Sequence, residues 1–280
     1  MLSELTVLEI IECGPRTRLG AGSGLFFLRI NAPGWEKSAP GQFVMLRASI
    51  DQAEYLCARP FSICRLTDDY LGIFFQARGR ATRDFAALKA GDRVCVWGPL
   101  GNFLPLDARV PTLILAGGIG IAPFVNYVDK HPDPEKITLE FGHRLPLGCY
   151  PFAELRPGCR ASAHLEKNGR DREAFSALVK ARIREFASSG IVLACGPTPF
   201  LRLVREFALK YKAETWLSLE TRMACGIGAC LGCAVKALLP PDVFIPSPAA
   251  LAGPLQPEDT ERFVQTCICG PNFRADRVLL

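Results

Sequence analysis

Residues 112–124 read TLILAGGIGIAPF, and this stretch decides the fold of the chain. It begins with an apolar run typical of a buried strand, continues through a glycine turn and ends where a helix would start. Glycines at such a turn let the backbone approach the phosphates of a dinucleotide. The pattern differs from G-x-G-x-x-G, so the turn alone is weak evidence for a nucleotide site. The candidate binding residues here are Gly117, Gly118, Gly120, Ala122 and Pro123.

The sequence downstream of this turn keeps alternating between strand and helix patterns. Residues 136–143, 161–167 and 191–197 predict strands, while residues 171–188 and 199–212 have helical spacing. Such alternation indicates a parallel α/β sheet, in which ligands bind beyond the carboxyl ends of the strands. The last of these strands ends in Cys195, Gly196 and Pro197. A cysteine there would touch a nicotinamide ring, although a buried cysteine that ends a strand explains the motif about as well.

The sequence upstream, to about residue 105, consists of short apolar or alternating runs separated by Gly, Pro, Asn and Asp. This pattern predicts an antiparallel barrel or sandwich, with one helical insert at residues 82–89. Arg59-Pro60-Phe61-Ser62 begins one strand: its arginine would clamp a pyrophosphate and its serine would reach a ring nitrogen. Gly79-Arg80-Ala81-Thr82 is either an anion site or an ordinary helix start capped by Thr82.

Cysteine spacing gives the strongest chemical signal in the chain. Five of the twelve cysteines follow residue 224, and three of them form the pattern Cys225-x4-Cys230-x2-Cys233. Plant-type [2Fe–2S] clusters are held by this spacing together with a distant fourth thiolate. Glycines between the cysteines allow the loop to curl around such a cluster. Structural zinc sites are the alternative, but they more often use short pairs of cysteines separated by a spacer.

The fourth thiolate is either Cys267 or Cys269. The turn at Gly270-Pro271 leaves Cys267 at the end of a strand, which favours Cys267. Cys269 would then be a small buried apolar residue or a thiol that binds no metal.

Composition excludes several classes of protein. A formal charge of +5 is far from that of a nucleic-acid binder. Residues 110–128 carry no charge, but their glycines and proline fit a strand, turn and helix better than a membrane span. No secretory signal is apparent, so we expect a cytoplasmic protein without a membrane span and without a nucleic-acid partner.

These motifs, in this order, resemble the ferredoxin–NADP reductase superfamily. The ending E-T-R-M-A-C-G-I-G-A-C-L-G-C, followed by C-x-C-G-P-N-F, is similar to the electron-transfer subunits of NAD-dependent (class 1B) dihydroorotate dehydrogenases. The resemblance covers nearly the whole chain. It implies an FAD-binding antiparallel β-barrel (residues 1–105), an NAD-binding α/β domain with a parallel sheet (106–217) and a [2Fe–2S] domain (218–280).

The resemblance also implies a path for electrons and roles for residues. Electrons would pass from an FMN-containing catalytic subunit through the cluster and FAD to NAD+, in pyrimidine (UMP) biosynthesis. The cluster ligands would be Cys225, Cys230, Cys233 and Cys267; Ser62 and Cys195 would lie at the reacting rings. FAD would contact Arg59, Pro60, Phe61, Ser62, Phe75, Gln76, Gly79, Ala81 and Thr82, and NAD would contact the glycine turn with Cys195, Gly196 and Pro197. A heterotetramer with two copies of each subunit is implied too.

The chain departs from the family pattern at three places. Thirty-three residues separate Cys233 from Cys267, which indicates a Pro-rich insertion at about 237–257. Ala81 replaces a usual glycine, and Cys269 replaces a usual acidic residue. Reductase subunits of ferredoxin:NADP oxidoreductases, sulfide dehydrogenases or hydrogenases therefore stay as alternatives, as does a zinc-stabilised binding module. The choice between NAD and NADP, for which Arg144 is a candidate residue, is left open.

Overall fold

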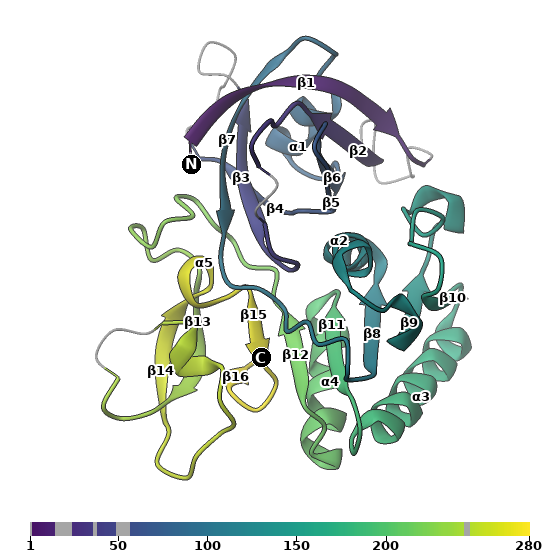
Figure 1. Ribbon diagram of the computed structural model, residues 1–280, viewed down its shortest axis with the longest axis vertical. Helices are drawn as coiled ribbons and strands as arrows, with labels where there is room; N and C mark the ends of the chain where they lie inside the picture. Colours follow the sequence, from purple (N-terminus) through teal and green to yellow (C-terminus); the bar gives the residue numbers. More distant parts are fainter. Residues whose placement is uncertain (1, 15–23, 36–37, 49–56, 244–246) are drawn as a thin grey trace.

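The structure, a computed structural model, describes residues 2–14, 24–35, 38–48, 57–243 and 247–280. It contains an antiparallel barrel, an α/β layer below it and a small cysteine-rich lobe beside both (Figure 1). Part of the Pro-rich insertion, residues 244–246, lies outside the described residues.

The barrel is one antiparallel sheet in the order β4-β3-β7-β1-β2-β6-β5. The two edge strands of this order, β4 and β5, are neighbours in sequence, so one kinked segment closes the barrel. At the kink, the Ile63 N–H donates to Gln42 O beside β3 and the Cys64 N–H donates to Gly72 O in β6. The strands are β1 (Leu2–Glu12), β2 (Leu25–Ile30), β3 (Phe43–Ala48), β4 (Arg59–Ser62), β5 (Arg65–Leu66), β6 (Leu71–Gln76) and β7 (Arg93–Leu100).

Two local expectations for the barrel need correction. Residues 60–66 read as one strand in the sequence but form two short strands, because the chain turns there from one sheet edge to the other. The helical insert, α1 (Arg80–Ala86), begins two residues before the expected start at 82. Its Phe85 is fully buried in the barrel core, so packing fixes the helix in place.

The α/β layer is a six-stranded sheet in the order β10-β9-β8-β11-β12-β15. Its first five strands are parallel, as expected, but β15 pairs antiparallel with β12 and belongs to the C-terminal segment. The sheet is therefore not wholly parallel. It is formed by β8 (Thr112–Gly117), β9 (Ile137–His143), β10 (Arg160–Leu165), β11 (Ile191–Cys195), β12 (Thr215–Ser218) and β15 (Asn272–Arg274).

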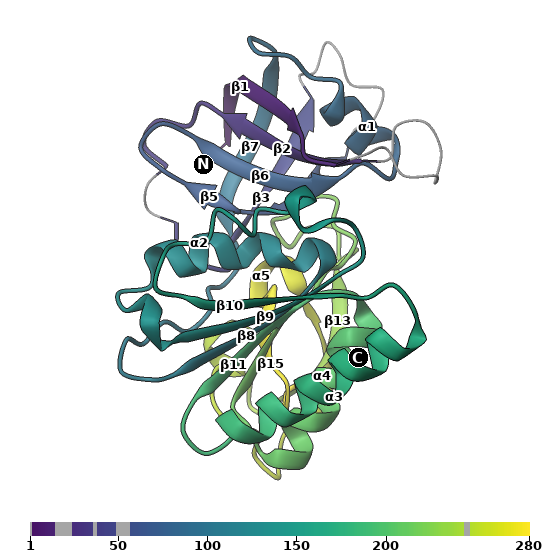
Figure 2. The same cartoon turned by 90° about the vertical axis from the view of Figure 1, so that its right-hand side faces the viewer.

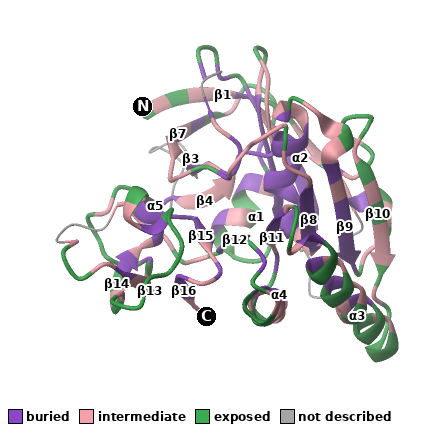
Figure 3. Cartoon of the chain, turned by 60° about the horizontal axis from the view of Figure 1, so that its bottom comes forward, coloured by how far each residue is buried: buried purple, intermediate pink, exposed green. Residues whose placement is uncertain are grey.

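Helices cover both faces of this sheet. The 3-10 helix η2 (Gly118–Ile121) and α2 (Ala122–Lys130) lie between the sheet and the barrel (Figure 2). On the opposite face, α3 (Gly169–Phe186) and α4 (Thr198–Tyr211) pack on the sheet. Figure 3 shows the central strands β8 and β9 buried and the outer side of α3 exposed.

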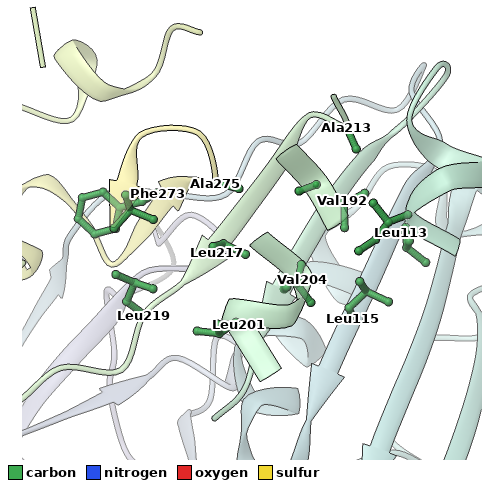
Figure 4. Packing of buried hydrophobic residues seen from close by; sticks show 14 of the residues in the cluster. Leu113, Leu115, Val192, Leu201, Val204, Ala213, Leu217, Leu219, Phe273 and Ala275 are labelled. Carbon is green, nitrogen blue, oxygen red and sulfur yellow. The ribbon is translucent and has the colours of Figure 1, made fainter. Parts of the chain in front are cut away.

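The α4 face of the sheet shares its core with the C-terminal lobe. Leu201 and Val204 of α4 lie over Leu113, Leu115 and Val192, and the same cluster continues to Phe273 and Ala275 of the C-terminal segment (Figure 4). The two parts therefore share one continuous apolar core.

The cysteine-rich lobe contains a three-stranded sheet, β14-β13-β16. The Pro-rich insertion connects β13 to β14 and carries the short 3-10 helix η5. Arg277 holds the insertion in place: it donates to the carbonyls of Gly253, Pro254 and Leu238 and pairs with Asp259. The elements are β13 (Ala234–Leu239), η5 (Ala249–Leu251), β14 (Thr260–Gln265), α5 (Thr266–Cys269) and β16 (Val278–Leu279).

Candidate functional site

A cavity of about 720 Å³ lies where the barrel, the α/β layer and the segment before the cysteines meet. Most of the residues singled out in the sequence line it. From the barrel these are Arg59, Pro60, Phe61, Ser62, Phe75, Gln76, Gly79, Ala81 and Thr82, and from the α/β layer Gly120, Ala122, Pro123, Cys195 and Gly196. Three of the predicted residues do not line it: Gly117, Gly118 and Pro197.

The barrel side of the cavity is built on β4, whose four residues are all half-buried. The Arg59 side chain folds back, and its Nη1 donates to the carbonyls of Cys57 and Ala58 at 2.8 and 3.0 Å. The Phe61 ring packs edge-on against Phe75 and Phe85. Phe75 is only 1% exposed, so its ring mainly supports Phe61 from the barrel core.

The turn at Gly79 is held by Thr82. Its Oγ1 accepts hydrogen bonds from the N–H groups of Arg78 and Gly79, at 2.9 and 3.0 Å. Gly79 is the N-cap of α1 and Thr82 occupies the third helical position, so Thr82 is not the N-cap. The hydroxyl braces the turn that faces the cavity.

The glycine turn after β8 packs directly on the end of β11. A Cβ on Gly120 would lie 2.3 Å from the Cys195 carbonyl oxygen, which explains why the position is glycine. Gly118 has a φ of +56°, which also favours glycine. A Cβ on Gly117 would lie 3.2 Å from Pro197 Cδ, so Pro197 limits the space beside the turn.

The sequence predicts that this turn receives a nucleotide, so Gly120→Ala should weaken that binding. The added methyl would push the turn away from Cys195 and Gly196, at a cost of about 1–3 kcal/mol in folding free energy. We expect NAD+ affinity, measured by titration calorimetry, to fall about tenfold. Gly169→Ala is the control, because a Cβ there meets no atom within 4 Å. Equal affinities for the two variants would contradict the role given to Gly120.

Cys195 lies at the bottom of the cavity between this turn and β12. Burial and the charge of Glu220 raise the pKa of its thiol to about 12, against weaker opposing hydrogen bonds from Ser218 and Gly196. The group is therefore a neutral thiol at physiological pH. It offers a polarisable contact for an aromatic ring, not a thiolate nucleophile.

The four predicted cluster cysteines come together as two pairs. Beside the effect of burial, the Cys230 side chain lowers the pKa of Cys225 and the Cys233 side chain raises the pKa of Cys267, so each thiol has a close partner. In the part of the chain that the structure describes, no three metal-binding side chains converge on one point. A tetrahedral zinc site would need all four thiolates on one ion. Two pairs instead suit the two irons of a [2Fe–2S] group, so the donor set fits that cluster better.

The backbone around Cys225 is arranged to stabilise a thiolate. Burial raises the pKa of Cys225, but the N–H groups of Ile227, Cys230 and Ala229 lower it more, to about 7. The Ile227 N–H lies 3.5 Å from the Cys225 sulfur. From the barrel, Trp97 Nε1 donates to the Cys225 carbonyl at 3.1 Å, so the cysteine loop is fastened to β7.

Cys267 and Cys269 lie in different surroundings. Cys267 shares a small apolar cluster with Cys233, Phe43 and Met45. Cys269 belongs to the core under the α/β sheet, 1% exposed. Both thiols are buried, and the packing of Cys267 beside Cys233 supports the prediction that Cys267 is the fourth ligand.

Sequence reasoning missed the segment from Glu220 to Met223, which lines the cavity. Met223 also packs against the cluster that contains Cys233 and Cys267. Met223, like Phe43 of β3, thus connects the cavity wall to the cluster that holds the thiols. The segment follows the parallel strand β12, which ends at Ser218, and this position could have revealed it, since ligands bind at such strand ends.

Comparison with known proteins agrees with this geometry. The family model of the iron-sulfur cluster binding domain of dihydroorotate dehydrogenase B matches residues 220–239. The electron transfer subunit of dihydroorotate dehydrogenase B (NAD(+)) from Caldanaerobacter subterraneus is 33% identical over 202 residues, or 72% of this chain and 78% of that protein. This chain belongs to that family of electron transfer subunits. The subunit from Listeria monocytogenes is 31% identical over 249 residues, covering 86% of this chain and 88% of the relative.

Solved structures share the fold of this chain. A chain of the NADH-dependent reduced ferredoxin-NADP oxidoreductase matches 98% of this chain and 89% of its own, with a TM-score of 0.74 and 19% identity. A ferredoxin NADP+ reductase from Neisseria gonorrhoeae, solved with FAD and NADP, matches 75% of this chain and 91% of its own, with a TM-score of 0.60 and 18% identity. The barrel and α/β layer therefore have the ferredoxin–NADP reductase fold. No helix among the described residues is long and apolar enough to cross a membrane.

Proposed function

We propose that this chain passes electrons from an FMN-containing, dihydroorotate-oxidising partner to NAD+, in pyrimidine (UMP) biosynthesis. Its FAD would occupy the 720 Å³ cavity and its [2Fe–2S] cluster the four paired thiols. The working units would be residues 1–105 for FAD, 106–217 for NAD and 218–280 for the cluster. The last two are tied together by β15, and β12 runs across their boundary.

The observation that carries this proposal is the convergence of three sites on one cavity. Barrel residues 59–62, the end of β11 and Met223 all line it, and Met223 also packs on the thiol cluster. Flavin and cluster bound there would supply the exchange between one-electron and two-electron transfer.

The chain's own residues would bind and orient the groups. Arg59 is one of four arginines on the cavity wall, with Arg78, Arg80 and Arg222, and it would bind a pyrophosphate; Ser62 would donate a hydrogen bond from its hydroxyl to a ring nitrogen. Thr82 keeps the Gly79 turn in shape. Cys195, a neutral thiol, would pack on the nicotinamide ring, and Gly117, Gly118 and Pro197 would set the turn that receives the NAD phosphates.

The partner would dock on the exposed face around the cysteine loop. Ile227 and Leu231 of the cysteine loop are 62% and 67% exposed, and Phe263 of β14 is 67% exposed. Ile268 of α5 lies against Gly228 of the cysteine loop. Leu231 also has a φ of +57°, a left-handed conformation that costs a non-glycine residue energy. Exposed apolar side chains grouped in this way mark an interaction surface. We infer a complex with two copies of each subunit.

Leu231→Ser should weaken this complex. Losing one central apolar anchor should lower the affinity for the catalytic subunit about tenfold, measured by analytical ultracentrifugation or interferometry. Leu209→Ser is the matched control: Leu209 is 42% exposed, but on α4. If both variants bind the partner like the wild type, the docking face lies elsewhere.

The proposed function is tested by separating its two half-reactions. NADH should bleach the flavin of the isolated chain, whereas dihydroorotate should do so only when the catalytic subunit is added. Turnover of dihydroorotate by the chain alone would overturn the proposal, because it would require a dihydroorotate site in this chain. Failure of NADH to reduce the flavin would overturn it equally.

A further inference from the structure

Two asparagines join the barrel to the segment that carries the last two cysteines. Asn102 comes just after β7 of the barrel, and Asn272 begins β15, just after α5 (Figure 1). The sequence marks both positions, in G-P-L-G-N (98–102) and C-G-P-N-F (269–273). Neither asparagine lines the cavity, so the candidate site described above gives them no role.

The Asn102 side chain pairs with the backbone of Asn272 as a neighbouring strand would. Its Oδ1 accepts a hydrogen bond from the Asn272 N–H at 3.0 Å, and its Nδ2 donates to the Asn272 carbonyl at 2.7 Å. The same Nδ2 donates to the Cys269 carbonyl at 3.1 Å, and the Asn102 N–H donates to the Gly270 carbonyl at 2.6 Å. One residue of the barrel thus holds the whole turn between α5 and β15.

The Asn272 side chain makes the reciprocal contact with the barrel. It is 1% exposed, and its Nδ2 lies 3.2 Å from the carbonyl of Gly41 and from the carbonyl and Oδ1 of Asn102. Gly101 lets the two segments approach: its φ is +75°, and a Cβ there would lie 2.6 Å from the Gly270 carbonyl oxygen. A buried network of side-chain amides of this kind rigidifies the contact between the elements that it joins.

The segment held by the two asparagines lies between the cavity and the thiols. Pro271 lines the cavity, and Cys267 is on α5, directly before the turn. The other half of the thiol set is fastened to the barrel separately, through the hydrogen bond from Trp97 Nε1 to the Cys225 carbonyl. Both thiol pairs are therefore tied to the barrel that would hold the flavin, each by its own polar contact.

We propose that Asn102 and Asn272 are positioning residues that set the separation between the [2Fe–2S] cluster and the flavin. This inference rests on the proposed function and names the residues that hold its two electron-carrying groups in place. Electron tunnelling falls off exponentially with distance, and a misplacement of about 1 Å at a reacting centre can lower a rate about a hundredfold. Since neither asparagine lines the cavity, their loss should slow electron transfer between flavin and cluster without slowing hydride transfer from NADH.

The test is stopped-flow reduction, by NADH and without oxygen, of the full chain loaded with flavin and cluster. NADH delivers two electrons to the flavin as a hydride; one of them passes on to the cluster and the other stays on the flavin. Asn102→Asp keeps the size of the side chain and its acceptor, but places an oxygen where Nδ2 faces the carbonyls of Cys269 and Asn272. We expect cluster reduction to slow about 10- to 100-fold, while flavin reduction keeps its wild-type rate.

Two further variants separate positioning from a general effect on folding. Asn102→Ala removes the side-chain hydrogen bonds without burying a charge, and it should slow cluster reduction in the same way. Asn168→Asp is the matched control, because Asn168 caps α3 through its Oδ1, which accepts from the Asp171 N–H, and aspartate keeps this acceptor. Both rates should stay unchanged in it.

Amide hydrogen exchange gives a second readout that does not depend on electron transfer. The Asn272 N–H is held by Asn102 Oδ1 in the wild type, so it should exchange about tenfold faster in Asn102→Ala. Iron and flavin content, and the electron paramagnetic resonance signal of the chemically reduced protein, should match the wild type in every variant. An unchanged signal shows that the cluster itself is intact and that only its transfer rate has changed.

The outcomes distinguish this inference from the function on which it rests. Cluster reduction at the wild-type rate in both Asn102 variants would overturn the positioning role. An equal slowing of flavin and cluster reduction would overturn it too, because the pair would then act on the fold as a whole. Loss of the cluster from both variants would show a role in holding the cluster, not in setting a distance. If NADH does not reduce the wild-type flavin, the proposed function itself fails.

Discussion

Cys267→Ser should abolish the [2Fe–2S] cluster, and Cys269→Ser should leave it in place. Cys267 is paired with Cys233 beside Phe43 and Met45, whereas Cys269 is buried in the separate core under the α/β sheet. Removing one of four thiolates leaves one iron with an incomplete ligand set. We expect iron content to fall from about two per chain to near zero, and electron transfer from the partner to fall at least a hundredfold. Iron analysis and electron paramagnetic resonance of the reduced protein measure this.

The pair of variants carries its own control. Both change a buried cysteine to serine two positions apart, so a general loss of folding would affect both. NADH reduction of the flavin should survive in each, because the barrel and the glycine turn are untouched. A cluster retained in Cys267→Ser and lost in Cys269→Ser would show that the fourth ligand is Cys269.

Arg277→Ala should strongly destabilise the cysteine-rich lobe. The side chains of Arg277 and Asp259 are 3% and 0% exposed, and they meet at 2.9 Å. The substitution leaves the Asp259 carboxylate buried without its partner and removes three hydrogen bonds to the insertion. Breaking a buried pair on one side costs about 3–5 kcal/mol of unfolding free energy. Denaturant unfolding followed by circular dichroism measures it.

Arg93→Ala is the matched control for this change. Arg93 pairs with Glu4 at 3.1 Å, but both side chains are about half exposed. Exposed pairs contribute less than about 1 kcal/mol. If Arg277→Ala and Arg93→Ala lower the free energy of unfolding by the same amount, the Arg277–Asp259 pair does not hold the insertion.

Much of the fold could be predicted because local patterns agree with it. The β8 run, its glycine turn and the strand–helix alternation after it are each marked by residues that need little tertiary context. What the pattern could not show was how distant pieces meet. Barrel closure depends on the kink at Ile63 and Cys64, and β15 joins the α/β sheet across more than fifty residues of chain. Both are long-range pairings, which hydrophobic periodicity does not encode.

The candidate site could be predicted where residue type and spacing indicate a particular chemistry. The cysteine spacing indicates a metal cluster, and R-P-F-S and the glycine turn indicate binding of a dinucleotide. Met223 and Phe75 show the limit: Met223 reads as an ordinary apolar residue, and only packing places it between cavity and thiols. Phe75 reads as a ligand contact; it lines the cavity, but its ring is also 1% exposed and packs on Phe61, which the sequence pattern does not show.

The central claim is that one chain holds a flavin and a two-iron cluster next to each other. The most direct measurement is the visible spectrum of the protein purified without oxygen, with iron, sulfide, zinc and flavin assayed on the same sample. We predict flavin bands over a broad cluster absorption, with about two irons, two sulfides and one FAD per chain. A colourless protein containing stoichiometric zinc would contradict the claim and identify the cysteine loop as a structural metal site.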